Sequence, residues 1–355
     1  MLCSKREFKK LGYKLEYSSC FDYLPLNNIV DGKRLEISTL QKACKGYRDI
    51  VFLAFHHTTS YLGKCSEKER GKILSEIKKH CRVLVWLDTA DSTGTCLFDV
   101  MPYVDLYFKK QLLKDVSIYE REVWGARIYC EYYHKKLGID DENVTSRIYP
   151  KLNPNDKNKL RVSWNVGVGD LFASTLQLYL HPFSRTIPHF VNPTDKRKNL
   201  DLQYRGSSFS PVAGYQRQYC KEVVSKIDHI THSDPYKKVP HDEYVREGMQ
   251  AKAIMSPFGW GEVCGRDFEA FVYGATMIKM DMGHCVTYPD AYQPGKTYVP
   301  VKWDFEDLEQ KLKDVKTKEY RNIAIYAQEW YKGCFEERFR GEFAKHIVQE
   351  LEMTK

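Results

Sequence analysis

The chain has 355 residues, of which 43% are hydrophobic and 29% are charged. This length exceeds the usual size of a single domain, so we expect two domains that share a cleft. The composition is typical of an ordinary soluble globular protein. The formal net charge of +8 suits an anionic partner. Because no dense Lys/Arg cluster lies on a recognisable nucleic-acid-binding motif, we expect a phosphorylated substrate or an anionic membrane surface and no nucleic acid.

The 11 cysteines are odd in number and include no C-x-x-C pair. Their pattern argues against a disulfide framework and against a zinc site, and it predicts a reducing compartment. The N-terminus has no signal-peptide core, and no apolar run approaches the length of a membrane span. We therefore expect a cytoplasmic protein, and we leave open a peripheral contact with a membrane.

In the N-terminal part, apolar runs alternate with helical patterns. We predict strands at 50–55, 83–87 and 105–108 and helices at 68–80 and 117–137. This alternation is typical of a parallel sheet, whose ligands gather at the carboxyl ends of the strands. The strand that usually opens such a domain is absent or very short, which indicates either a fragment or a lost strand. The polar side chains at the strand ends are candidates for a site: His56, His57, Asp88, Asp91, Lys109 and Lys110.

A polar, charged run at 192–199 predicts a linker, so we divide the chain into domains 1–195 and 196–355. The second domain restarts the alternation. We predict strands at 200–204 and 229–232, helices at 214–227, 240–250 and 304–314, and a largely helical segment at 318–350.

The segment 253–281 predicts a βαβ unit. The apolar run Ala253–Met255 is followed by Ser256-Pro257, a glycine-rich turn at 259–262, a helix at 266–273 and a second apolar run at 275–278. Such a turn places backbone N–H groups at a helix N-terminus, where anions such as phosphates bind. In the alternative interpretation, the glycines only turn the chain.

These features resemble the GT-B glycosyltransferases, and most of all the group-1-like family that builds surface polysaccharides in bacteria or viruses. The resemblance is good over about 200–303 and only architectural over 1–195. It is carried by Tyr204-Arg205-Gly206-Ser207, Tyr215-Gln216-Arg217, Ser256-Pro257-Phe258-Gly259-Trp260-Gly261-Glu262, Arg266-Asp267-Phe268-Glu269-Ala270-Phe271 and Gly274.

The resemblance implies an α/β protein of the GT-B fold. Two doubly wound, Rossmann-like domains would face a cleft, and a long C-terminal helix would pack back toward the first domain. A nucleotide sugar would bind mainly to the second domain, and a glycan or lipid-linked saccharide acceptor mainly to the first. The nucleotide sugar would be a co-substrate, and neither a metal ion nor another cofactor is expected.

The resemblance also implies a set of donor-binding residues. Arg205 and Arg217 would grip phosphate oxygens, and Glu269 would accept hydrogen bonds from the donor ribose. The full set is Arg205, Gly206, Arg217, Ser256, Gly259, Trp260, Gly261, Glu262, Arg266 and Glu269. In the alternative interpretation, the arginines form salt bridges at the surface and Glu269 is a solvated charge on a helix.

One position departs from the family. Retaining members commonly carry a glutamate eight positions before the one at Glu269, but this chain has Gly261 there, and the nearest acid is Glu262. An inverting enzyme would need a general base from the first domain. Asp91 and Asp88 are the leading candidates, followed by His56 or His57. For Lys109 and Lys110, a solvated basic pair is the favoured interpretation.

Two other functions stay open. A nucleotide-sugar 2-epimerase shares the two-domain fold and would need a carboxylate and a histidine that face the sugar. A non-catalytic GT-B-like subunit of a polysaccharide assembly complex would need no phosphate ligands.

Overall fold

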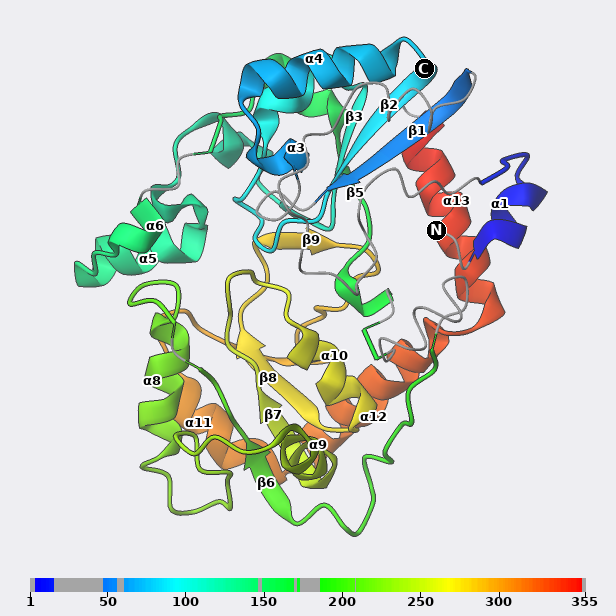
Figure 1. Ribbon diagram of the computed structural model, residues 1–355. Helices are drawn as coiled ribbons and strands as arrows, with labels where there is room; N and C mark the ends of the chain where they lie inside the picture. The colour runs from blue at the N-terminus through cyan, green and yellow to red at the C-terminus, as the bar shows by residue number, and fades with distance from the viewer. Residues whose placement is uncertain are drawn as a thin grey trace.

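A computed structural model describes residues 4–15, 47–55, 61–145, 149–168, 171–172, 186–207 and 209–352. In these ranges the chain forms two four-stranded sheets, in each of which every pair of neighbouring strands is parallel. Figure 1 shows one sheet above the other, with helices around each. The predicted α/β class with two Rossmann-like sheets is confirmed. We call each sheet with its covering helices a half of the molecule.

The N-terminal half is built on the sheet β1-β2-β3-β5. Side chains of β2 alternate between its two faces, because the period of a strand is two. Leu84 and Trp86 pack with the helix α4, whereas Val83 and Val85 pack with the helix α13. The elements of this half are α1 (Lys5–Lys10), β1 (Arg48–Phe55), α3 (Tyr61–Lys64), α4 (Glu67–Lys78), β2 (Cys81–Asp88), β3 (Leu106–Lys109) and β5 (Leu160–Val162), with short 3₁₀ turns at Phe98–Tyr103, Val116–Glu120 and Pro154–Lys159.

The C-terminal half is built on the sheet β10-β8-β7-β6. The predicted βαβ unit is confirmed as β7, α10 and β8. The predicted strand at 229–232 is wrong, since only an isolated bridge joins His232 to Leu202 there. The elements are β6 (Leu200–Gln203), α8 (Tyr215–Val224), α9 (His241–Gln250), β7 (Ala251–Met255), α10 (Gly265–Val272), β8 (Thr276–Met280), β10 (Val299–Val301), α11 (Leu308–Lys313) and α12 (Lys318–Gly333).

Two segments pack against the half that does not contain their chain neighbours. The helix α13 (Glu337–Glu352) leaves α12 and packs on the N-terminal sheet. The helix α5 (Ile128–Leu137), which α6 (Glu142–Thr145) follows, places Tyr129 and Tyr133 in the core of the C-terminal half. We predicted one helix over 117–137, but it is broken before α5, where Gly125 has a φ of 66°. The domain boundary at 192–199 stays a prediction.

A small antiparallel sheet joins the two halves. The strand β4 (Gln111–Leu113) follows β3, and β9 (Cys285–Thr287) follows β8. Leu112 pairs with Val286, and Leu113 pairs with Cys285. The junction therefore contains a hydrogen-bonded ladder as well as loop contacts. No helix in the described ranges combines the length and the apolar character that a membrane span requires.

The packing of α13 gives a first prediction. Ile347 is fully buried against the N-terminal sheet, so Ile347→Ala should lower the free energy of unfolding by about 2–5 kcal/mol. Urea unfolding measures the change. Gln349 is exposed on the same helix, and Gln349→Ala should stay within about 0.5 kcal/mol of the wild type. Equal effects of the two substitutions would contradict this packing.

Candidate functional site

The carboxyl ends of β2 and β3 meet those of β7 and β8 at the centre of the molecule. The loop after β2 closely approaches the turn between β7 and α10. A Cβ atom added at Gly261 would overlap the carbonyl oxygen and carbon of Asp91. A side chain at position 261 would therefore force the two backbones apart. Retaining members of the family that this segment resembles carry a glutamate at this position.

Glu262 binds the opposite half. Its side chain is fully buried. One carboxylate oxygen accepts a hydrogen bond of 2.7 Å from the Thr93 hydroxyl, and the other accepts one of 2.9 Å from the Thr93 backbone N–H. Nε2 of His284 lies 4.0 Å from the same carboxylate. Glu262 therefore bridges the two halves and does not face solvent.

The turn at 258–260 is held by its carbonyl groups. Three consecutive carbonyl oxygens each accept a hydrogen bond from a side chain. The pairs are Arg217 Nε to Phe258 (2.9 Å), Tyr129 Oη to Gly259 (2.9 Å) and Arg127 Nε to Trp260 (2.8 Å). Since Tyr129 and Arg127 come from the segment around α5, this segment fixes the turn.

Arg217 lies where an anion could reach it. In the described ranges it has no carboxylate partner. A Cβ at Gly259 would lie 2.6 Å from Arg217 Nη2, so the glycine makes room for the guanidinium group. The guanidinium lies 5.0 Å from the centre of the Phe209 ring, and Phe209 lies 4.6 Å from Trp260. The guanidinium group of Arg127 lies 5.2 Å from the centre of the Trp260 ring. Arg217 is half-buried and Arg127 is buried, so Arg217 is the accessible cation.

Arg205 is placed differently. Its Nε donates 2.6 Å to Glu247, its Nη2 contacts the other oxygen of the same carboxylate, and Nη1 donates to the backbone of Asp234 and Lys237. The guanidinium group is thus occupied within the protein. At the neighbouring Gly206, the Tyr204 hydroxyl fills the space of a side chain.

Ser256 lies in a buried network at the start of α10. Asp267 accepts hydrogen bonds from Ser256 (2.6 Å), Tyr292 (2.6 Å), the Cys264 backbone (2.9 Å) and Lys279 (3.0 Å). Asp267 and Lys279 are both fully buried. The Ser256 hydroxyl therefore holds the turn in place from inside.

Glu269 and Arg266 lie farther along α10. Tyr244 donates 2.6 Å to Glu269. Burial and the Glu269 carboxylate raise the pKa of Tyr244 to about 12, so its hydroxyl keeps its proton at neutral pH. Arg266 donates 2.9 Å to the carbonyl oxygen of Arg205, and its buried Nε has no hydrogen-bond partner among the described residues.

The two candidate bases of the N-terminal half differ sharply. Asp88 is buried and accepts hydrogen bonds from Lys109 (3.0 Å), from the Ala90 backbone (2.7 Å) and from Tyr107. Asp91 leaves 54% of its side chain exposed and contacts Lys110 at 3.2 Å. Asp91, which is ion-paired with Lys110, is therefore the more exposed of the two carboxylates.

Our prediction of a solvated basic pair is wrong for Lys109. This residue is fully buried, and it donates to Asp88 and to the carbonyl oxygen of Thr95. Burial lowers the pKa of Lys109, but the Asp88 carboxylate outweighs this effect and raises it. His56 and His57 lie outside the described residues.

Several contributors to the junction were missed in the sequence. Thr93, Phe209 and Arg127 belong to no strand end or motif that pointed to them. His284 follows β8 and could have been found by the strand-end rule, but it lies four residues beyond the strand. Within the described ranges, no group of three or more His, Cys, Asp or Glu side chains is placed to hold a metal ion.

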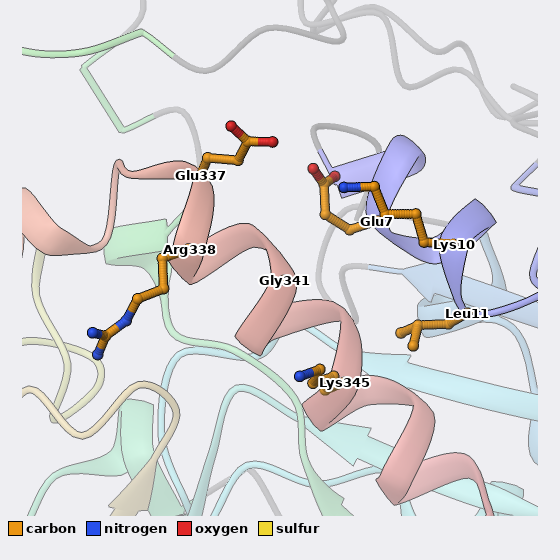
Figure 2. Close-up of a pocket in the computed structure, with 7 residues that line it drawn as sticks. All are labelled: Glu7, Lys10, Leu11, Glu337, Arg338, Gly341 and Lys345. Carbon is orange, nitrogen blue, oxygen red and sulfur yellow. The ribbon is translucent and has the colours of Figure 1, made fainter.

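A cavity of about 210 Å³ lies between α1 and α13, away from the junction (Figure 2). It is lined by Glu7, Lys10, Leu11, Glu337, Arg338, Gly341 and Lys345. Its lining mixes acidic and basic groups, contains no aromatic ring and includes none of the predicted site residues. It therefore does not have the character of a nucleotide site.

No protein-family model matches the sequence, and no curated protein matches it. Similar solved structures include Anabaena HepE in complex with UDP-glucose, at 10% identity and a TM-score of 0.43, covering 88% of this chain and 80% of that chain. A GtfA/B complex is similar at 11% identity and a TM-score of 0.47, over 90% of this chain and 60% of that chain. The UDP-GlcNAc 2-epimerase of Methanocaldococcus jannaschii, in complex with UDP-GlcNAc and UDP, is similar at 13% identity and a TM-score of 0.30, over 99% and 95%. These similarities concern the course of the backbone and do not identify catalytic or ligand-binding side chains.

The close approach at Gly261 gives a second prediction. Gly261→Ala should push the loop of Asp91 away and lower the free energy of unfolding by about 1–3 kcal/mol. Gly341 lies in α13 with open space around it, and Gly341→Ala should be neutral or stabilising by up to about 1 kcal/mol. Chemical unfolding of both variants measures the difference. A neutral Gly261→Ala would rule out the tight contact.

His284 gives a third prediction, on pH. Burial lowers its pKa below 6.5, although Glu262 and Asp281 oppose the shift and Lys279 adds to it. The unfolded chain therefore binds the proton more tightly than the folded protein does. The stabilising contribution is present above pH 6.5 and is lost as the pH falls through 6.5 toward the folded pKa.

Unfolding measured across this range should show a weaker pH dependence for His284→Asn than for the wild type. His241 is exposed on α9, and His241→Asn serves as the control. An unchanged slope in His284→Asn would contradict the lowered pKa.

Proposed function

We propose that the protein is a GT-B glycosyltransferase that moves a sugar from a nucleotide-sugar donor to a glycan or lipid-linked saccharide acceptor. The observation that carries the proposal is Arg217, an accessible arginine without a carboxylate partner. It lies beside the turn between β7 and α10, where the strand ends of both halves meet. The resemblance of this segment to the donor motif of that family adds support.

In the proposed donor complex, Arg217 binds the diphosphate. A guanidinium group suits this role because it offers two parallel donors to phosphate oxygens. Glu269, held by Tyr244, accepts hydrogen bonds from the ribose hydroxyls. Arg205 acts indirectly, since its carbonyl oxygen holds Arg266 while Glu247 holds its guanidinium group.

The proposed reaction is a single displacement with Asp91 as general base. Asp91 takes the proton of the acceptor hydroxyl as its oxygen bonds to the anomeric carbon. The bond between the anomeric carbon and the phosphate oxygen breaks, and its electron pair leaves with the nucleoside diphosphate. Arg217 stabilises the charge that develops there, so the proposal needs no metal ion. Attack from the opposite side inverts the anomeric centre.

One observation bears on the epimerase alternative. Glu262 and His284 form a carboxylate–histidine pair at the junction. Both carboxylate oxygens of Glu262 are bound by Thr93 in a fully buried position, so the pair does not face a sugar. We therefore favour glycosyl transfer, and we extend the proposal to polysaccharide biosynthesis in the cytoplasm, with peripheral membrane contact included.

Nucleotide binding tests the proposal. In a thermal-shift screen, UDP, GDP or one of their sugars should stabilise the wild type, by about 2.7 kcal/mol at a ligand concentration 100 times its Kd. Arg217→Ala should abolish this stabilisation, because the diphosphate loses its cation. Arg246 is exposed on α9, and Arg246→Ala should keep the stabilisation. Release of nucleoside diphosphate from the stabilising sugar then measures turnover.

Two results would overturn the proposal. The first is the absence of stabilisation by every nucleotide and nucleotide sugar in the screen. The second is stabilisation that Arg217→Ala and Arg246→Ala leave equally intact, since the nucleotide would then bind elsewhere. Free epimerised sugar nucleotide, formed without an acceptor, would support the epimerase instead.

A further inference from the structure

The loop that carries Asp91 is fixed at its backbone, whereas the carboxylate is exposed and contacts Lys110. The backbone of Gly261 packs against the Asp91 carbonyl group, and the Gln111 side chain donates a hydrogen bond to the same oxygen. Gln111 is fully buried. The Asp91 side chain extends from this fixed backbone with 54% of its area exposed.

Thr93 anchors the same loop to the other half. Each of its polar groups has a partner. Its hydroxyl and N–H donate to Glu262, and its carbonyl oxygen accepts 3.0 Å from the Tyr119 hydroxyl. Thr93 and Glu262 are both fully buried. Two charge-assisted hydrogen bonds to one carboxylate fix both the distance and the orientation of the loop.

We propose that Thr93 and Glu262 form a positioning pair that sets Asp91 against the donor site. This inference rests on the proposed function. The base lies on the N-terminal half and the donor ligands lie on the C-terminal half, so the reaction needs a fixed distance between the halves. A misplacement of about 1 Å can cost about 100-fold in rate. Thr93 touches no substrate and acts through Asp91.

A purely structural role for the pair makes a different prediction. Loss of a buried hydrogen bond would then lower stability, while each folded molecule would keep its rate. A positioning role lowers kcat and leaves the KM for the donor unchanged, because Arg217 and Glu269 lie on the C-terminal half. Steady-state kinetics separates the two roles.

The test uses Thr93→Val, which keeps the shape of the side chain and removes its hydroxyl. The probe is whichever of UDP-glucose, UDP-GlcNAc and GDP-mannose stabilises the wild type most, and the readout is nucleoside diphosphate release. We expect kcat to fall about 10- to 100-fold, with KM within about 2-fold. Thr93→Ser should restore most of the loss, and Asp91→Asn combined with Thr93→Val should lose little beyond Asp91→Asn alone.

Thr276→Val is the matched control. Thr276 is also buried, and its hydroxyl donates 2.6 Å to the carbonyl oxygen of Tyr320, at the opposite end of β8 from the junction. This variant should lose stability and keep kcat. If Thr93→Val does not fold, Glu262→Gln keeps the shape of the carboxylate without its charge and should show the same selective loss of kcat.

Each remaining outcome decides against the inference. A kcat of Thr93→Val within about 2-fold of the wild type would leave the pair only a structural role. Equal losses of kcat in Thr93→Val and Thr276→Val would have the same meaning. Absence of nucleotide stabilisation and turnover in the wild type would instead overturn the proposed function, and this inference with it.

Discussion

The contact between the two halves depends on a buried carboxylate. Parallel strands end in loops whose polar groups must find partners when they are buried. Glu262 supplies both acceptors for Thr93, and the β4–β9 ladder satisfies the neighbouring backbone. With these groups paired, the loops approach so closely that a Cβ atom at position 261 would overlap the Asp91 backbone. The junction is therefore closed where Glu262 meets Thr93, whereas Arg217 is half-buried and Asp91 is exposed.

Two buried ion pairs lie beside the junction and neutralise charges in its interior. Lys109 neutralises Asp88 in the N-terminal half, and Lys279 neutralises Asp267 in the C-terminal half. A buried ion needs such a partner, because its desolvation cost is large. Each pair fixes the loop that follows a central strand. The junction thus combines rigid, fully paired charges in its interior with accessible ones at its rim.

The sequence predicted three of the four strands of each sheet, but it missed β5 and β10, and it did not predict the state of each charge. Apolar runs and the glycine turn predict β7, α10 and β8 because these signals are local. Asp88 pairs with Lys109 and Asp91 pairs with Lys110, and only the structure shows that Asp88 is buried and Asp91 is exposed. Arg205 and Arg217 belong to motifs that resemble the family equally well. Only the structure shows that Glu247 binds the guanidinium group of Arg205. Partners that are distant in sequence decided each of these cases.

The position of the acid after β7 links the architecture to stereochemistry. In the retaining enzymes that this segment resembles, a glutamate stands at the position of Gly261. In this chain the N-terminal half occupies the space of that side chain, and the acid one residue later turns to Thr93. The tight junction is therefore compatible with glycine at this position and would have to open for a glutamate. A junction of this kind leaves no acidic side chain at position 261, and the single displacement that we propose therefore takes its base, Asp91, from the opposite half.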